Sequence, residues 1–166
     1  MSLVIALFFI STLTSCSLFS GKKNPQSIKV TLLASSDINP NIESKPAPLG
    51  IYIYELKTPD TFDNSDYYSI IKNTNNEFSQ QSSKLYQAIL LPGEKRHIEI
   101  SPEKSSVALG VVATFRDINH ADWNKTIMFP AVKPVPWWKL MHSEEKYILS
   151  IDFSKTSISK IKWIKM

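Results

Sequence analysis

Few residues of this chain are of a type and spacing that could do chemistry, and its only cysteine, Cys16, is the clearest of them. A single thiol forms no disulfide within the chain and completes no Cys-x-x-Cys pair. The three histidines, His97, His120 and His142, lie far apart and form no His-x-x-x-His spacing. Structural zinc needs three or four such ligands held together. We therefore expect neither a metal site nor a bound cofactor.

Nucleophilic catalysis finds equally little support in the sequence. There is no Gly-x-Ser-x-Gly turn, and four glycines in all leave no loop that could cradle a phosphate. Asp37, Asp117 and Asp122 can be paired on paper with a histidine and a serine, but any chain of this size permits such pairings. We interpret the protein as a non-enzyme without a small-molecule substrate.

Cys16 has a different chemical setting, because the apolar run from Leu3 to Ile10 and then Leu13-Thr14-Ser15 precede it. Eight apolar residues are too few to span a bilayer, which needs roughly 20, but they suit a secretory signal. A leucine three places before a cysteine, with small residues between, resembles a bacterial lipobox. The resemblance implies removal of residues 1–15 and acylation of Cys16. Residues 16–27, polar and rich in turn formers, would then be a flexible tether.

Composition indicates a globular domain over residues 28–166, since 43% of the chain is apolar and 20% is charged. The net charge of +4 is spread along the chain and forms no dense basic stripe. A nucleic-acid partner is therefore not expected.

Alternation of apolar and polar residues predicts most of the elements of this domain as strands. They cover residues 28–34, 49–56, 86–90, 96–100, 105–115, 147–153 and 158–164, with 105–115 as the central strand. The period becomes helical after Pro59, which predicts a short helix over 63–73 and then a polar connector to about Ser83. Residues 84–101 fit either a hairpin or a strand-turn-strand corner, and 126–138 reads as extended and irregular. Seven to eight strands with a small helical insertion predict an all-β fold, an antiparallel β-sandwich.

Two stretches stand out as candidates for binding. Residues 35–48 contain three prolines and several Asn and Ser residues, and a loop of this length in a β domain is more often functional than idle. The pair Trp137-Trp138 could stack on a sugar ring, anchor a protein partner or close one end of the core. Trp123 and Trp163 are interpreted as packing residues.

Several short motifs along the chain, taken together and in order, resemble those of a known protein family. They are Cys16 with its lipobox, Asp37-Ile38-Asn39-Pro40, Pro46-Ala47-Pro48-Leu49-Gly50-Ile51-Tyr52-Ile53-Tyr54-Glu55-Leu56-Lys57, Phe62, Asp66-Tyr67, Leu91-Pro92-Gly93-Glu94, Leu109-Gly110-Val111-Val112-Ala113-Thr114-Phe115-Arg116-Asp117 and Trp123. With them the chain resembles the TssJ (SciN-like) outer-membrane lipoproteins of type VI secretion systems, over most of the mature chain to about residue 125.

The resemblance implies a transthyretin-like sandwich held by lipid on Cys16 at the outer membrane and facing the periplasm. It also implies a scaffold role in the trans-envelope complex, with the periplasmic C-terminal part of the inner-membrane protein TssM docking on the loop between the first two strands. The matching partner-binding residues are Ser36, Asp37, Ile38, Asn39, Pro40, Asn41, Lys45, Pro46 and Pro48. Replacing residues 37–41 with Gly and Ser is expected to remove binding and leave a cooperative fold. The alternative is a carbohydrate- or peptidoglycan-binding envelope lipoprotein that uses Trp137 and Trp138.

Overall fold

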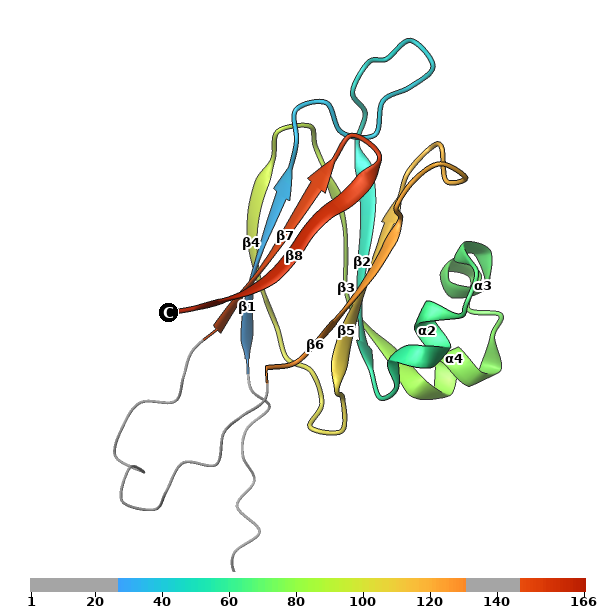
Figure 1. Cartoon of the computed structure of the whole chain (residues 1–166), viewed down its shortest axis with the longest axis vertical. Coiled ribbons are helices and arrows are strands. Elements are labelled where there is room, and N and C mark those ends of the chain that lie inside the picture. The colour runs from blue at the N-terminus through green and yellow to red at the C-terminus, as the bar shows by residue number, and fades with distance from the viewer. Residues whose placement is uncertain (1–26, 131–146) are drawn as a thin grey trace, which may run out of the picture.

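Two four-stranded β-sheets packed face to face form the body of the protein (Figure 1). The computed structural model describes residues 27–130 and 147–166. The sheets have the strand orders β4-β1-β7-β8 and β3-β2-β5-β6. The strands are β1 (Ile28–Ala34), β2 (Leu49–Leu56), β3 (Ser82–Leu90), β4 (Lys95–Ile100), β5 (Ala108–Thr114), β6 (Asn124–Met128), β7 (Tyr147–Ser154) and β8 (Ser157–Lys165). The expected β-sandwich is confirmed.

The alternating pattern of β1 shows how the sequence specifies these layers. Ile28, Val30, Leu32 and Ala34 are buried between the two sheets, while Lys29 on the other face is exposed. In β5, and in β2 from Ile53 onward, the alternation is lost because these strands are covered on both faces, by the first sheet and by helices. Residues 105–115 were expected as the central strand, and β5 is an inner strand of its sheet, as is β2.

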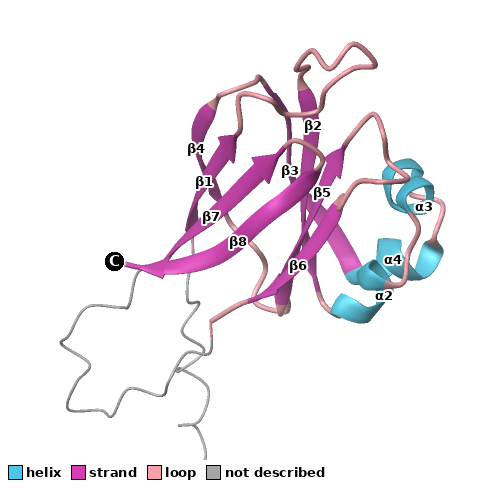
Figure 2. Cartoon of the chain, turned by 45° about the horizontal axis from the view of Figure 1, so that its top comes forward, coloured by secondary structure: helices cyan, strands magenta, loops and turns pink. Residues whose placement is uncertain are grey.

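Three short helices cover the outer face of the second sheet (Figure 2): α2 (Pro59–Asp63), α3 (Tyr67–Lys72) and α4 (Asn76–Gln81). The single helix expected over 63–73 is therefore wrong, as is the connector after it. The Asp66 side chain accepts a hydrogen bond from the Ser69 backbone N–H, which starts a new helix at Tyr67. Asn73 then ends α3 in the left-handed region, with φ of 52°, and the side chain of Asn75 caps α4.

Gly110 in β5 allows the helical layer to approach the sheet. A Cβ atom at this position would lie 2.8 Å from ring carbons of Phe62, the buried residue of α2. A glycine inside a strand predicts a bulge or the close approach of another backbone. The structure shows the close approach, and its partner is an aromatic ring rather than a backbone.

The sheet topology decides several further predictions about the strands. β3 and β4 belong to different sheets, so residues 84–101 form the corner and not the hairpin. β6 is a regular strand, so the prediction of irregular structure over 126–138 is wrong for residues 126–128; residues 131–138 lie outside the described part of the chain. β1 and β7 pair in parallel, and the other pairings are antiparallel. The strands predicted over 147–153 and 158–164 pair as the hairpin of β7 and β8, and β8 is the edge strand that carries Lys160 and Lys162.

The sandwich has two distinct ends. At the loop end four connections meet, residues 35–48, 91–94, 115–123 and 155–156 (Figure 1). At the opposite end, which we call the tether end, β1 begins at Ile28. The seven residues of β1 separate the two ends by roughly 20 Å.

Candidate functional site

The β1–β2 loop, residues 35–48, is fixed at its base by Ile38. This side chain has no exposed surface and belongs to the core cluster between the sheets. Its carbonyl accepts a hydrogen bond of 3.1 Å from the Ala47 N–H, so the two sides of the loop are joined above the core. The base of the loop is therefore a continuation of the folded domain.

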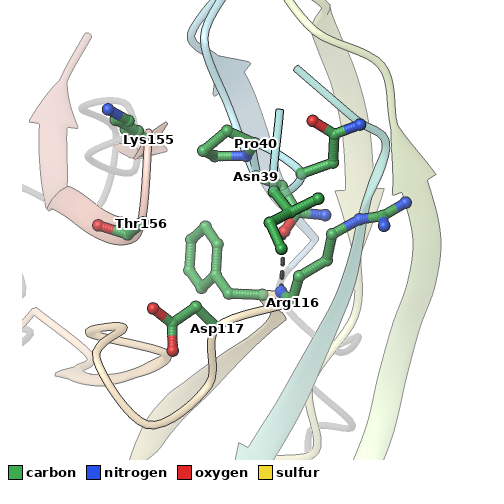
Figure 3. Close-up of a pocket in the computed structure, with 9 residues that line it drawn as sticks. Asn39, Pro40, Arg116, Asp117, Lys155 and Thr156 are labelled. Carbon is green, nitrogen blue, oxygen red and sulfur yellow. Dashed lines mark hydrogen bonds between the residues drawn. The ribbon is translucent and has the colours of Figure 1, made fainter. Parts of the chain in front are cut away.

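Asn39 connects this base to two neighbouring connections (Figure 3). Its Oδ1 accepts from the Arg116 N–H at 2.9 Å, and its Nδ2 donates to the Pro48 carbonyl at 2.7 Å. Its own N–H donates to the Lys155 carbonyl at 2.9 Å. Asn39 adopts φ of 48°, a conformation that asparagine tolerates better than most residues. One buried amide thus holds three segments of the loop end in a fixed relation.

Asn41 organises the tip of the loop. Its side-chain Oδ1 accepts from the backbone N–H groups of Glu43 and Lys45, at 3.0 and 2.9 Å. The Asn41 N–H donates to the Lys45 carbonyl at 2.8 Å, and Ser44 takes φ of 60° to complete the turn. Asparagine suits this task because its short side chain can replace a backbone acceptor. The tip is closed by its own hydrogen bonds.

Ile42 projects from this closed tip with a relative exposure of 102%. A fully exposed isoleucine gains nothing from the fold, and it stands between Asn41 and Glu43 on a turn that is otherwise polar. The sequence reasoning did not name Ile42. An apolar residue flanked by polar ones in a loop rich in Asn and Pro is a signal, but buried Ile38 gives the same one.

An open groove of about 710 Å³ lies beside the tip. Residues 39–42, 115–117 and 155–156 line it, and Figure 3 shows Pro40 and Lys155 on one side and Arg116 and Asp117 on the other. The groove offers apolar surface from Pro40 and Ile42 next to charges of both signs. This composition fits a polypeptide segment better than a small uniform ligand.

The turn at residues 91–94 supports the loop from the other side. Gly93, with φ of 75°, donates its N–H to the Ser35 carbonyl at 3.0 Å. The Glu94 carboxylate accepts from the Leu91 N–H at 2.8 Å and pairs with Arg96. These contacts, with the Leu91 N–H first, lower the pKa of Glu94 below its usual range.

The structure separates the predicted partner-binding residues by burial. Ile38 and Asn39 are buried and hold the loop, whereas Pro40 and Asn41 are half-buried. The exposed members are Ser36, Asp37, Lys45, Pro46 and Pro48. All of them belong to the one loop, but only the exposed and half-buried residues offer surface to a partner.

The residues considered for chemistry do not converge in the part of the chain that is described. His97 contacts the Thr31 hydroxyl at 3.0 Å, and His120 pairs with Asp117 at 2.9 Å on the surface. Among the described residues no three His, Cys, Asp or Glu side chains could hold a metal ion together. Cys16, His142, Trp137 and Trp138 lie outside those residues.

Trp123 and Trp163 behave as the packing residues that the sequence predicted. Both pack against the core between the sheets, and the Trp163 Nε1–H donates to the Met128 carbonyl at 2.8 Å. Within residues 27–130 and 147–166, no helix has the length and apolar character that crossing a membrane requires.

Solved structures of similar fold come from type VI secretion systems. The chain superposes on the lipoprotein TssJ1 from Pseudomonas aeruginosa with a TM-score of 0.69 and 24% identity, over 86% of this chain and 97% of that one. Lip from Serratia marcescens, titled a membrane bound component of the type VI secretion system, gives 0.69 and 17%, over 85% and 98%. A chain in a structure titled T6SS protein TssM C-terminal domain from EAEC gives 0.59 and 17%, over 84% and 98%. At these identities the likeness shows the fold alone.

Membership of a family comes from the sequence comparison. A search of curated proteins gives no match. The family model T6SS-SciN, described as type VI secretion lipoprotein, VasD, EvfM, TssJ, matches residues 26–155, which include the whole β1–β2 loop. The chain therefore belongs to the TssJ family of type VI secretion lipoproteins.

Proposed function

We propose that this protein is the outer-membrane-anchored scaffold of a type VI secretion trans-envelope complex and has no enzymatic activity. Residues 1–15 are the signal peptide, and acylated Cys16 with residues 17–27 forms the tether at the periplasmic side of the outer membrane. The β1–β2 loop receives the periplasmic C-terminal part of a TssM-like inner-membrane protein. The family supports the setting, and the braced loop that presents Ile42 is the observation that carries the docking site.

The bracing of the loop favours its use as a docking site. Association costs free energy for every flexible segment that must become ordered. Here Asn39 and Asn41 already fix the base and the tip through side-chain hydrogen bonds to four backbone groups. A partner therefore meets a surface that needs little rearrangement.

The placement of the loop also suits a scaffold between two membranes. The loop end lies opposite the tether end, where β1 starts directly after the segment that begins at Cys16. A protein held at Cys16 would thus keep the loop at the far end of β1, roughly 20 Å from the tether. The loop then stays accessible to an inner-membrane partner.

The anchor is tested by Cys16→Ser. Three acyl chains would bind at about 0.8 kcal/mol per buried CH₂, so detachment from the membrane is negligible while they are present. We expect Cys16→Ser to lose its place in the outer-membrane fraction and to stop secretion. A Cys16→Ser protein that still fractionates with the outer membrane would contradict the anchor.

The docking site is tested by Ile42→Ala in a titration with the periplasmic C-terminal part of the TssM-like partner. Burying an isoleucine at an interface contributes about 1.5–3 kcal/mol, so affinity should fall by roughly tenfold to a hundredfold. Ile89→Ala is the matched control, because Ile89 is 63% exposed on β3 and lies outside the loop. Equal affinities for wild type and Ile42→Ala would move the interface elsewhere.

Carbohydrate or peptidoglycan binding through Trp137 and Trp138 stays the alternative hypothesis. Both residues lie outside the described part of the chain. Quenching of tryptophan fluorescence by cell-wall fragments, lost in Trp138→Ala, would favour this alternative over the scaffold.

A further inference from the structure

The outer face of the sheet β4-β1-β7-β8 carries four exposed lysines, which we call the lysine face: Lys29 on β1, Lys95 on β4, and Lys160 and Lys162 on β8. None of the four takes part in an ion pair with a described residue. The helices pack on the other sheet, where α2 contacts β5 and β6 and α4 contacts β3. Within the described part of the chain, nothing covers this face.

The strand register places these lysines side by side. Leu33 on β1 pairs with Lys95 on one side and with Asp152 on the other, and Asp152 pairs with Lys160. Two residues along the sheet, Ser150 pairs with Lys162. With strands about 4.8 Å apart and alternate residues about 6.7 Å apart, the four ammonium groups share an area roughly 15 Å across. Because no described residue covers this face, all four can approach one surface.

Charge is distributed unequally between the two outer faces of the sandwich. Among the described residues of the lysine face only Glu99 and Asp152 oppose the four lysines, and the Ser27 hydroxyl donates a hydrogen bond to Glu99. On the other outer face, the helical layer, residues 57–81, has two lysines against three aspartates and one glutamate, and Lys84 of β3 lies beside it over the Tyr52 ring. The described part of the molecule is therefore cationic on one broad side and slightly acidic on the other.

We propose that the lysine face lies against anionic phospholipid headgroups of the same membrane that holds Cys16. This inference rests on the proposed anchor. Cys16 is eleven residues before Ser27, a segment that reaches at most about 38 Å, and β1 then enters the middle of this sheet. The cationic face is thus the broad surface that the anchor keeps within reach of the bilayer.

The strength of such a contact follows from general electrostatics. A lysine near an anionic lipid surface favours binding by roughly fivefold, and the attraction decays within a Debye length of about 8–10 Å. The effect is weak for a free protein. A tether makes the second contact intramolecular and so raises its effective concentration into the millimolar range. Ile164 and Met166, 42% and 59% exposed at the end of β8, add apolar surface beside the lysines.

The test uses the acylated protein in vesicles with a fluorescent probe that reports polarity. Because Cys16 is the only cysteine and is blocked by acylation, Ile164→Cys adds one free thiol on this face for labelling. Gln80→Cys, on an exposed position of α4 in the acidic layer, is the matched control. We expect the emission of the Ile164→Cys label to shift to the blue in phosphatidylglycerol-containing vesicles relative to phosphatidylcholine vesicles, and the control label to stay unchanged.

Charge reversal then tests the lysines themselves. Lys160→Glu with Lys162→Glu should abolish the blue shift, as should 0.5 M salt. Lys72→Glu with Lys84→Glu changes the net charge by the same amount away from the face and should leave the shift intact. Flotation of each variant with its vesicles checks the anchor separately. An Ile164→Cys protein that floats with both kinds of vesicle but shows the same label emission in both would overturn the proposal.

Discussion

The β1–β2 loop contains two isoleucines four residues apart, and the structure predicts opposite consequences for the same substitution at each. Ile38 has no exposed surface and packs in the core cluster, whereas Ile42 is fully exposed at the tip. Ile38→Ala removes three buried carbons, about 2.4 kcal/mol by transfer alone, and leaves a cavity. The expected loss is therefore about 3–4 kcal/mol in the free energy of unfolding.

Chemical denaturation of the acylated protein in detergent measures this difference. With a slope of about 2 kcal/mol per molar urea, Ile38→Ala should lower the midpoint by roughly 1.5–2 M. Ile42→Ala should change the free energy of unfolding by less than about 0.5 kcal/mol, because it touches no buried surface. The slope itself should stay constant for both variants.

Equal midpoints for the two variants would refute the division of the loop into a buried base and an exposed tip. The same division corrects an expectation from the sequence, namely that replacing residues 37–41 with Gly and Ser spares the fold. That replacement removes Ile38 and Asn39 together, so a loss of partner binding in it would reflect a damaged domain. Ile42→Ala is the cleaner test of docking.

Three further perturbations probe how the loop end and the helical layer are held. Asn39→Ala removes two side-chain hydrogen bonds and places alanine at a positive φ, which should cost about 3 kcal/mol in urea unfolding; Asn39→Gly should recover about 1 kcal/mol of it. Gly110→Ala should destabilise by about 1–3 kcal/mol through overlap with the Phe62 ring, and a Phe62→Leu background should reduce that cost in a double-mutant cycle. Glu94 has a lowered pKa in the fold, so its contribution to stability is present above the unfolded-state pKa of about 4.3 and is lost as pH falls through the folded-state pKa. Glu94→Gln should flatten that acid limb of the stability curve, and an unchanged limb would contradict the role of the Leu91 contact.

The strands were predictable from sequence wherever one face of a sheet is open. β1, β4 and β8 alternate because solvent covers their outer sides, and the period of two is then visible. The pairing of strands was not predictable in the same way. After β3 the chain could fold back to pair β4 with β3, or it could cross to the other sheet. The second outcome depends on the pairing of β4 with β1, a strand more than sixty residues earlier in the chain.

The helical layer shows the opposite difficulty. Phe62, Tyr67, Ile70 and Ile71 recur at helical spacing, which predicts one helix over 63–73 followed by a polar connector. In the structure, three short helices bury Phe62, Ile70 and Phe78 in turn, because local caps end each helix and start the next. The side-chain caps at Asp66 and Asn75 set where α3 and α4 begin, and the spacing of apolar residues carries no information about such caps.

The candidate site was predictable as a segment but not residue by residue. Length and proline content identify residues 35–48 as a loop worth attention. They do not distinguish Ile38, which faces the core, from Ile42, which faces solvent, because both stand among polar neighbours. The distinction comes from Asn39 and its bonds to Arg116 and Lys155, contacts with residues more than seventy positions away.

β1 connects the two proposed functions of the protein by the shortest path in the chain. Its first residue, Ile28, follows the tether, and its last residue, Ala34, leads into the docking loop. It is an inner strand, paired with β4 along one side and with β7 along the other. In the proposed complex, a pulling force between Cys16 and the docked partner would act along β1. Extracting the strand would then require the ladders of hydrogen bonds to β4 and to β7 to break at the same time. A scaffold joined to two membranes needs this arrangement more than it needs a cleft, and the parallel β1–β7 pairing that the sequence did not reveal supplies one of the two ladders.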